Sequence, residues 1–239
     1  MANFPFQRLQ SELANLISHT PAGQRLLSEP ELAKKMGVSR ATLREAMRTF
    51  ETQGLIRRRQ GAGTFVVGQV PVLDSGLEIL ESLDTMARRL NLEVTFSDLQ
   101  TERVFADQNL AEQLDVPLAT HLSRICRVIR ADERPVAYLI DTLPEDVLKL
   151  EDLPNSFSGS VLDHLVACGA PLTVARTAIS AIGASAEVAK SIEIQRGDVL
   201  LQFESQLFDA KSRVVDYTLS YFIPGYFNFH VVRRVGTGG

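Results

Sequence analysis

The chain is poor in the residues that build covalent and metal-dependent sites. It has 2 cysteines and 4 histidines among 239 residues; the histidines are scattered without zinc-like spacing, and no Cys/His cluster occurs. A phosphate-cradling glycine loop and a G-x-S-x-G nucleophile motif are also missing. We therefore expect no metal, no cofactor and no catalytic residue. Cys126 and Cys168 stand in apolar surroundings and are predicted to be buried free thiols.

Long apolar runs are missing as well. The first residues, MANFPFQRLQSEL, lack the apolar segment of a secretory signal, and no stretch approaches a membrane span. Apolar content of 45% and charged content of 23% are values of globular proteins. These features predict a cytoplasmic protein without a membrane partner, long enough for one large domain or two ordinary ones.

Charge is divided unevenly along the chain. The net charge of −4 would by itself argue against a nucleic-acid partner. Residues 1–70, however, hold 10 basic and 5 acidic side chains, whereas residues 71–239 hold 15 basic and 24 acidic ones. A basic head on an acidic body is the pattern expected when a DNA-binding domain is joined to a domain that does not bind DNA.

The basic head contains the pattern of a helix-turn-helix. Ser28-Glu29-Pro30-Glu31 predicts a capping box with proline in the first turn of a helix. Gly37 ends this helix, Ser39 caps the next one, and Gly54 stops it. Two helices joined by a short turn that contains glycine form a helix-turn-helix.

The second of these helices carries the predicted DNA contacts. Arg40, Thr42 and Arg44 lie in its first turns, which is the part of a recognition helix that reaches base edges. Because a guanidinium fork matches guanine O6 and N7, Arg40 and Arg44 are predicted to read bases. Ser28, Ser39 and Thr42 are expected to give hydroxyls to phosphates. The alternative is that the arginines are ordinary solvated residues of an amphipathic helix.

A hairpin with a glycine-rich turn follows the helices. Residues 55–59 and 64–67 are short β-type runs on either side of Gln60-Gly61-Ala62-Gly63. A hairpin in this place is a wing, and Gly61 and Gly63 allow its backbone to approach the sugar-phosphate chain closely. The adjacent arginines, Arg59 among them, would supply charge for phosphates, unless the strand is simply a solvated basic one.

The remainder of the chain predicts a mixed α+β domain. The proposed division is a DNA-binding domain at 1–68, a linker at 69–76 and a second domain at 77–239. Hairpin turns at 132–135 and 209–212 join adjacent strands, so we expect a mainly antiparallel sheet. The strands are predicted at 101–106, 122–131, 136–143, 176–184, 199–208 and 214–222, and the helices at 77–90, 159–167 and 185–192.

Several blocks of the head occur together in one known family. They are Leu27-Ser28-Glu29, Glu31-Leu32-Ala33, Gly37-Val38-Ser39-Arg40, Thr42-Leu43-Arg44-Glu45-Ala46, Gly54-Leu55-Ile56 and Gly61-Ala62-Gly63-Thr64-Phe65-Val66. With these blocks, residues 6–67 resemble the winged helix-turn-helix of the GntR family of bacterial transcription regulators. Pro30 departs from the family pattern, which usually has an arginine there, so the resemblance implies that one DNA contact is missing.

A second resemblance covers residues 76–235. It is carried by Arg127, Ala131-Asp132, Pro135-Val136-Ala137, Pro144, Gly159-Ser160, Ala181, Ala184, Gly197-Asp198, Val215-Asp216-Tyr217, Ser220-Tyr221 and Phe229. This part is similar to the UTRA domain, the effector-binding module of the HutC branch of the same family, whose fold is like chorismate lyase. The resemblance implies a homodimeric repressor that is released or repositioned on double-stranded operator DNA when a small molecule binds.

The resemblance also implies effector contacts. Arg127 matches an arginine that faces an anionic ligand in relatives, although it could instead form a cross-strand salt bridge. Asp216 stands where relatives have a glutamate that grips ligand hydroxyls. Ser82 and Ser160 match small hydroxyls at helix starts near the pocket, and both could be mere caps.

Other matched positions are apolar where sugar-phosphate-binding relatives have an arginine, a glutamate and two tyrosines. These positions are Ile129, Leu139, Leu162 and Phe222. An unpaired polar group would cost a ligand roughly 1–3 kcal/mol in such a pocket. We therefore expect an effector less polar than a sugar phosphate, such as an organic acid with an apolar body whose carboxylate meets Arg127. A one-residue shift of the strand would exchange Ile129 for Arg130.

Together these patterns predict a sequence-specific DNA-binding transcription regulator that is controlled by a small-molecule effector and is not an enzyme. The rival interpretations are a metabolic enzyme with a DNA-binding head and a DNA-binding protein that responds to no ligand.

Overall fold

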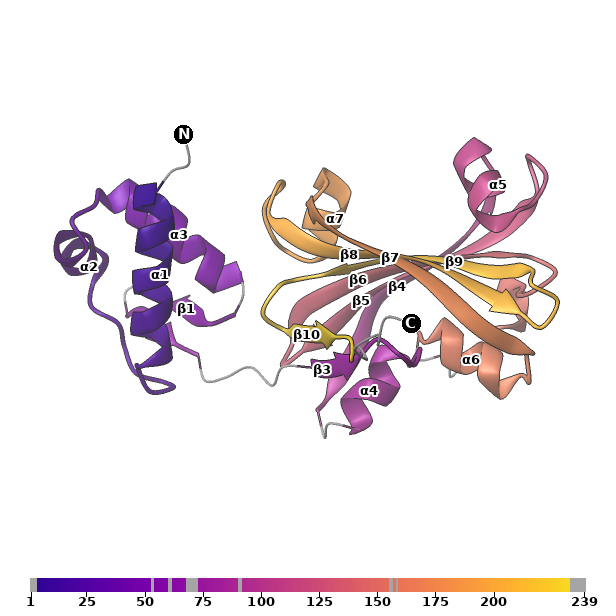
Figure 1. Cartoon of the computed structure of the whole chain (residues 1–239), viewed down its shortest axis with the longest axis horizontal. Coiled ribbons are helices and arrows are strands. Elements are labelled where there is room, and N and C mark those ends of the chain that lie inside the picture. Colours follow the sequence, from indigo (N-terminus) through magenta and orange to yellow (C-terminus); the bar gives the residue numbers. More distant parts are fainter. Residues whose placement is uncertain are drawn as a thin grey trace, which may run out of the picture. The chain divides into compact units, whose positions relative to one another are not determined.

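The computed structural model describes residues 4–52, 54–59, 62–67, 73–89, 92–154, 157 and 159–232. The chain forms two compact units, Met1–Val72 and Leu73–Gly239 (Figure 1). Each unit has a hydrophobic core of its own. No helix in the described part of the chain is long and apolar enough to cross a membrane.

The N-terminal unit is a winged helix-turn-helix, as predicted. Its elements are α1 (Phe4–Ser18), α2 (Glu29–Lys35), α3 (Arg40–Thr52), β1 (Ile56–Arg59) and β2 (Gly63–Val66). The two strands pair as an antiparallel hairpin. Because apolar residues recur every three or four positions, each helix buries one face against the others. The buried core comprises Leu9, Leu13, Ile17, Leu26, Leu32, Ala33, Leu43, Ala46, Met47, Phe50, Ile56 and Val66.

Local capping begins the two helices where the sequence predicted. The Glu31 carboxylate accepts hydrogen bonds from the Ser28 backbone N–H at 3.0 Å and from the Ser28 hydroxyl at 2.6 Å, at the start of α2. Gly37 follows α2 with a φ of +67°, which glycine adopts without a steric penalty. The Ser39 hydroxyl accepts a hydrogen bond from the Thr42 N–H at 3.1 Å, at the start of α3.

The C-terminal unit is built on an antiparallel sheet of six strands in the order β4-β5-β6-β9-β8-β7. The prediction of an α+β fold with a mainly antiparallel sheet is therefore confirmed. The strands are β4 (Val94–Phe105), β5 (His121–Ala131), β6 (Arg134–Pro144), β7 (Leu172–Gly183), β8 (Val199–Asp209) and β9 (Val214–Phe222). A separate parallel pair consists of β3 (Leu73–Gly76) and β10 (Phe227–His230).

Helices cover both faces of this sheet. In Figure 1, α4 (Leu83–Arg89), α6 (Val161–Ala167) and the β3–β10 pair lie on one face, and α5 (Gln108–Leu114) and α7 (Ala186–Ser191) lie on the other. A short 3-10 turn, η1, spans Leu150–Asp152. The core under α6 contains Ile125, Leu143, Leu148, Val161, Leu165, Leu207 and Val215, and the core under α5 contains Ala106, Leu110, Leu114, Leu122, Val214 and Tyr217.

Residues 73–90 differ from the prediction. The end of the expected linker is strand β3, and the helix expected from residue 77 begins only at Leu83. The Leu77 N–H donates to the His230 carbonyl at 2.9 Å, which continues the pairing with β10 and keeps this segment extended. The Ser82 hydroxyl then accepts from the Thr85 N–H at 3.0 Å and starts α4.

The structure differs from the sequence analysis at two further places. Helix α5 was not predicted, although Asp107 caps it by accepting a hydrogen bond from the Leu110 N–H at 2.8 Å. The prediction of two buried thiols is wrong for Cys168, which is exposed, whereas Cys126 is half-buried. Cys168 directly follows α6 and lies beyond its buried face, so its apolar sequence neighbours do not enclose it.

Candidate DNA-reading surface and effector site

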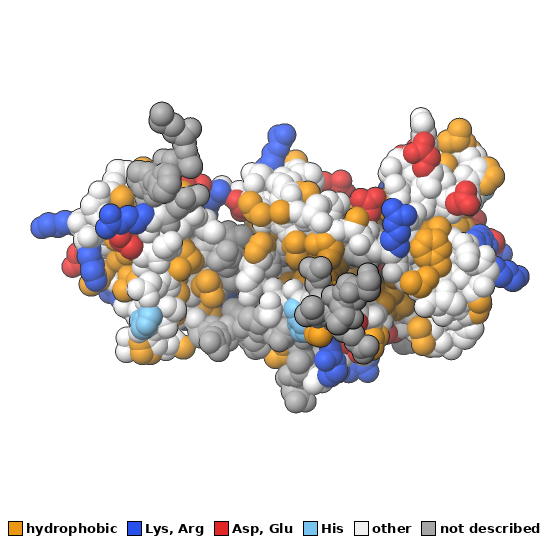
Figure 2. Space-filling view, viewed as in Figure 1, with side chains coloured by type: hydrophobic (Ala, Val, Ile, Leu, Met, Phe, Trp, Pro, Cys, Tyr) orange, Lys and Arg blue, Asp and Glu red, His pale blue; other side chains and the backbone are white. Residues whose placement is uncertain are grey.

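Helix α3 presents its predicted base-reading residues to solvent. Arg40 and Arg44 are exposed, whereas Leu43 and Met47 of the same helix are buried. A surface hollow in the N-terminal unit is lined by Arg40, Ala41, Arg44, Glu45, Arg48 and Arg58. Lysine and arginine side chains also stand out on the face of this unit drawn in Figure 2. The arrangement gives a concave, strongly basic surface beside the recognition helix.

The predicted hydroxyl contacts lie at the helix starts. Thr42 is half-buried and Ser39 is exposed, and their hydroxyls are 2.8 Å apart. Ser28 is half-buried, and its hydroxyl donates to Glu31 within the capping box. All three therefore have a local structural role, and their contacts with phosphates stay a prediction.

The wing combines an exposed arginine with a glycine of positive φ. Arg59 is exposed, and its guanidinium carbon lies 5.4 Å from the centre of the Phe65 ring. Gly63 has a φ of +111°, and a Cβ there would meet the side chain of Arg25. Gly63 therefore needs the freedom of glycine. Gly61 lies outside the described residues.

An ion-pair network beside α3 was not predicted. The Arg44 Nε donates to Glu29 Oε2 at 2.6 Å, across 15 positions of the chain. Arg58 of the wing lies 3.6 Å from the other Glu29 oxygen and 3.4 Å from Glu51. No local spacing rule relates these positions, because the fold alone brings them together.

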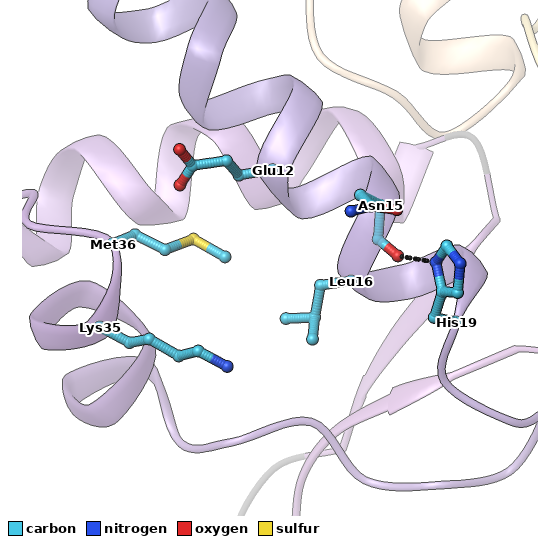
Figure 3. Close-up of a pocket in the computed structure, with 6 residues that line it drawn as sticks. All are labelled: Glu12, Asn15, Leu16, His19, Lys35 and Met36. Atoms are coloured by element: carbon cyan, nitrogen blue, oxygen red, sulfur yellow. Dashed lines mark hydrogen bonds between the residues drawn. The ribbon is translucent and has the colours of Figure 1, made fainter.

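Another hollow lies between α1 and α2 (Figure 3). The His19 ring is held at 2.8 Å from the Asn15 carbonyl oxygen. All the lining side chains are exposed or half-buried, so this hollow holds no buried charge that would select a ligand. The lining residues are Glu12, Asn15, Leu16, His19, Lys35 and Met36.

In the C-terminal unit, the sheet gathers a buried polar cluster on the face that carries α6. Arg127 on β5, Asp141 on β6 and Asp216 on β9 are 4%, 4% and 3% exposed. Arg127 Nη1 donates a hydrogen bond to Asp141 Oδ2. Thr218 lies opposite Asp141 across the β6–β9 pair, and its hydroxyl is 3.1 Å from both Asp141 Oδ1 and Asp216 Oδ2. The structure therefore brings Arg127 and Asp216 into one cluster, and it adds Asp141, which the sequence analysis did not single out.

Hydrogen counting shows where a proton belongs in this cluster. The Thr218 hydroxyl has one hydrogen but faces two carboxyl oxygens, so one of the contacts needs a second hydrogen. Burial and the neighbouring Asp141 carboxylate raise the pKa of Asp216 well above its ordinary value, against a smaller lowering by Thr218 and Arg127. Burial thus favours the neutral form of Asp216, and in that form its carboxyl would donate to Thr218 while Thr218 donates to Asp141. The charge of Arg127 is balanced by Asp141.

Two atoms of the cluster stay unsatisfied. Arg127 Nε and Asp216 Oδ1 are buried without a hydrogen-bond partner in the described part of the protein. Buried polar atoms are normally paired, and an unpaired one costs free energy that a bound molecule can recover. These two atoms therefore mark the place in this domain where a ligand with polar groups would gain most.

The two serines of the predicted site are linked through Asp163. Ser160 caps α6 by accepting from the Asp163 N–H at 3.2 Å, and Ser82 donates to the Asp163 carboxylate at 2.6 Å. Just before Ser160, Gly159 has a φ of +98°, and a Cβ there would lie 3.1 Å from the Cδ of Arg127. The start of α6 therefore passes directly over Arg127, although both serine hydroxyls already serve as caps.

Phe222 belongs to an aromatic wall on the same face. Its ring centre lies 5.0 Å from that of Phe203, 4.8 Å from Phe227 and 5.0 Å from Phe229. Phe227 and Phe229 come from β10, which the sequence analysis did not predict. This wall lies on the same face of the sheet as the cluster, towards the Ala137–Phe222 end of the β6–β9 pair.

The strand register places Ile129, and not Arg130, on the face of Arg127. Ile129 is buried opposite Ala137, and Leu139 is buried beside it. The Arg130 guanidinium contacts the Ser97 hydroxyl at 2.8 Å and Glu193 at 3.0 Å. Its hydrogen-bonding groups are therefore engaged elsewhere. Leu162, the fourth apolar replacement, is half-buried beside the core under α6.

No group of three or more His, Cys, Asp or Glu side chains within the described ranges could hold a metal ion.

Comparison with known proteins identifies the family of each unit. Residues 6–66 match the model of bacterial regulatory proteins of the gntR family, and residues 89–228 match the UTRA domain. The chain is similar to the HTH-type transcriptional repressor NagR of Bacillus subtilis, with 29% identity over 74% of this chain and 72% of that protein. It is 28% identical to a probable fructoselysine utilization operon repressor of Escherichia coli, over 54% of this chain and 51% of that one.

The fold is also that of a solved relative. The crystal structure of PhnF from Mycobacterium smegmatis superposes with a TM-score of 0.65 at 20% identity, covering 95% of this chain and 100% of that one. These similarities are to transcription regulators and not to enzymes. The chain therefore belongs to the GntR family of bacterial regulatory proteins, as a DNA-binding transcription regulator whose second domain is an effector-binding UTRA domain.

Proposed function

We propose that this regulator binds a palindromic operator as a homodimer, and that a small molecule in the C-terminal domain changes its affinity for that operator. The DNA-binding domain would comprise residues 1–68, and the C-terminal unit, which begins at Leu73, would form the effector-binding and dimerisation domain. A protein that acts on an operator works in the cytoplasm, where the bacterial chromosome lies. Repressor names among the relatives support a repressing role.

On the DNA side, α3 enters the major groove with Arg40 and Arg44 toward the bases. Their exposure on the recognition helix is the observation that supports this role. A two-fold symmetric dimer would contact half-sites about one helical turn apart, roughly 34–36 Å. The phosphate contacts would come from Ser28, Ser39, Thr42, Arg59 and the wing glycines Gly61 and Gly63.

On the effector side, the unsatisfied Arg127 Nε and Asp216 Oδ1 carry the proposal. Because Arg127 already uses Nη1 for Asp141, only its Nε edge is left for a ligand group. A sugar phosphate would bring two negative charges to an arginine that is already paired with Asp141, whereas a carboxylate brings one, so the less charged effector fits better. We therefore propose an organic acid whose carboxylate meets Arg127 and whose apolar body lies against Phe222, close to Ser82 and Ser160.

Differential scanning fluorimetry tests the effector class. The protein would be heated with sugar phosphates and, in parallel, with aliphatic and aromatic acids. We expect an acid to raise the Tm, because a ligand that binds only the folded state stabilises it. A large shift with a sugar phosphate alone would contradict the proposal.

A further inference from the structure

The guanidinium of Arg44 is held by one edge. Its Nε donates to Glu29 Oε2 at 2.6 Å, and the terminal nitrogens Nη1 and Nη2 take no part in that contact. Bidentate recognition of guanine needs two parallel donors directed at O6 and N7. The terminal pair of Arg44 can supply them only when the guanidinium plane has a fixed orientation. The contact with Glu29 provides a means of fixing it.

Glu29 is also less exposed than Arg44 and has a second ion-pair partner. Its side chain is 18% exposed, whereas that of Arg44 is 56% exposed. Its second oxygen lies 3.6 Å from Arg58 Nη1, and Arg58 in turn lies 3.4 Å from Glu51. The Glu51 carboxylate also accepts the Arg58 backbone N–H at 3.3 Å. One carboxylate thus connects the first residue of α2 with the recognition helix and with strand β1 of the wing.

The Arg44–Glu29 ion pair is not needed to explain the stability of the N-terminal unit. An ion pair with a half-exposed partner contributes little to the free energy of unfolding. An arginine side chain, however, loses much rotamer freedom when it binds, and a contact that orders it beforehand reduces that loss.

We propose that Glu29 is a positioning residue for base recognition: it orients Arg44 so that Nη1 and Nη2 point at a guanine, while its other oxygen is ion-paired with Arg58 of the wing. This inference rests on the proposed base-reading role of Arg44. The competing consequence of the same geometry is purely electrostatic, since a carboxylate near DNA weakens binding to every sequence alike.

The test begins by selecting duplexes that the full-length protein binds from a random pool. Fluorescence anisotropy then measures affinity for the selected duplex and for a panel with single base-pair changes. The variants are Glu29→Ala, Glu29→Gln, Arg44→Ala and the double variant Arg44→Ala with Glu29→Gln. Glu45→Gln is the matched charge control, because Glu45 lines the same hollow, is 62% exposed and pairs with Arg48 instead of Arg44.

Arg44→Ala identifies the base pair that Arg44 reads, where one bidentate contact discriminates by roughly 5- to 150-fold. We expect Glu29→Ala to lose at least about fivefold of that preference. Glu29→Gln should lose less, because its amide oxygen can still accept from Arg44 Nε. Adding Glu29→Gln to Arg44→Ala should change the preference no further, since residues that act through one contact are not additive.

The possible results distinguish a failure of the positioning role from a failure of base reading by Arg44. If both Glu29 variants only strengthen binding to all duplexes by the factor seen for Glu45→Gln, the positioning role is wrong while Arg44 still reads its base. If Arg44→Ala leaves every base preference intact, the proposed function of Arg44 itself fails. Binding of each variant to an unselected duplex shows that it is folded, and the Glu29→Gln series decides the question if Glu29→Ala does not fold.

Discussion

Arg127 and Asp141 form a buried ion pair between neighbouring strands of the C-terminal sheet, with Nη1 of Arg127 donating to Oδ2 of Asp141. Removing one partner of such a pair leaves an uncompensated buried charge. We expect Asp141→Ala to lower the free energy of unfolding of this domain by about 3–5 kcal/mol.

Urea denaturation followed by tyrosine fluorescence measures this loss, because all 4 tyrosines belong to the C-terminal domain. Asp146→Ala is the control: its carboxylate pairs with Arg213 at 2.7 Å but is 64% exposed. An exposed pair of this kind contributes about 0–1 kcal/mol. Equal losses in the two variants would contradict the buried pairing.

Asp216 should make the stability of this domain depend on pH. Burial raises its pKa in the folded state from the ordinary value of 3.8, so the folded state binds more protons than the unfolded one at intermediate pH. The contribution of Asp216 to stability is therefore fully present below pH 3.8 and is lost as the pH rises through the folded-state pKa. Asp216→Asn, which cannot ionise, should show a flatter decline in urea stability with rising pH. Parallel curves for the two proteins would show that Asp216 is ionised when folded.

Gly159 should be needed next to Arg127. An alanine there would adopt a φ of +98° and bring a Cβ within 3.0 Å of the Phe96 ring and 3.1 Å of Arg127. We expect Gly159→Ala to destabilise the domain by about 1–3 kcal/mol from backbone strain alone, with the crowding added. Gly169→Ala is the matched control, because Gly169 has a φ of +73° and no atom within 4 Å of an added Cβ. Equal urea midpoints for the two variants would rule out the crowding.

Arg44 and Arg59 should differ in how they affect DNA binding. Arg44→Ala should relax the preference for one base pair and cost about 1–3 kcal/mol there. Arg59→Ala should weaken binding to all sequences alike and reduce the salt dependence by the equivalent of about one phosphate contact. Anisotropy titrations against the base-substitution panel at several salt concentrations separate the two effects. If Arg44→Ala weakened binding to all sequences equally, its base-reading role would be wrong.

Much of the fold could be predicted because its signals are local. The Ser28–Glu31 capping box, the glycine at the end of α2 and the apolar faces of the helices are all recognised within a few residues. The hairpin turns at residues 132–135 and 209–212 likewise revealed the antiparallel sheet. Whether Ile129 or Arg130 shares the face of Arg127 was left open by the sequence, and the register of β5 and β6 decides it.

What the sequence did not predict depends on contacts between distant residues. Strand β3 exists because it pairs with β10, which lies about 150 positions along the chain, so residues 73–76 had the composition of a linker. Asp141 becomes the partner of Arg127 only through the register of β5 and β6. Glu29 reaches Arg44 only because α2 and α3 pack at a particular angle. Capping and hydrophobic patterns contain no information about these pairs.

The most direct measurement combines both domains in one titration. The affinity of the full-length protein for its selected operator duplex is determined by fluorescence anisotropy, with and without a saturating amount of the acid that raises its Tm. Our account predicts that this effector changes the Kd for the operator by roughly 5- to 150-fold, the usual range of coupling between two sites. An operator Kd that is identical with and without the bound effector would contradict it.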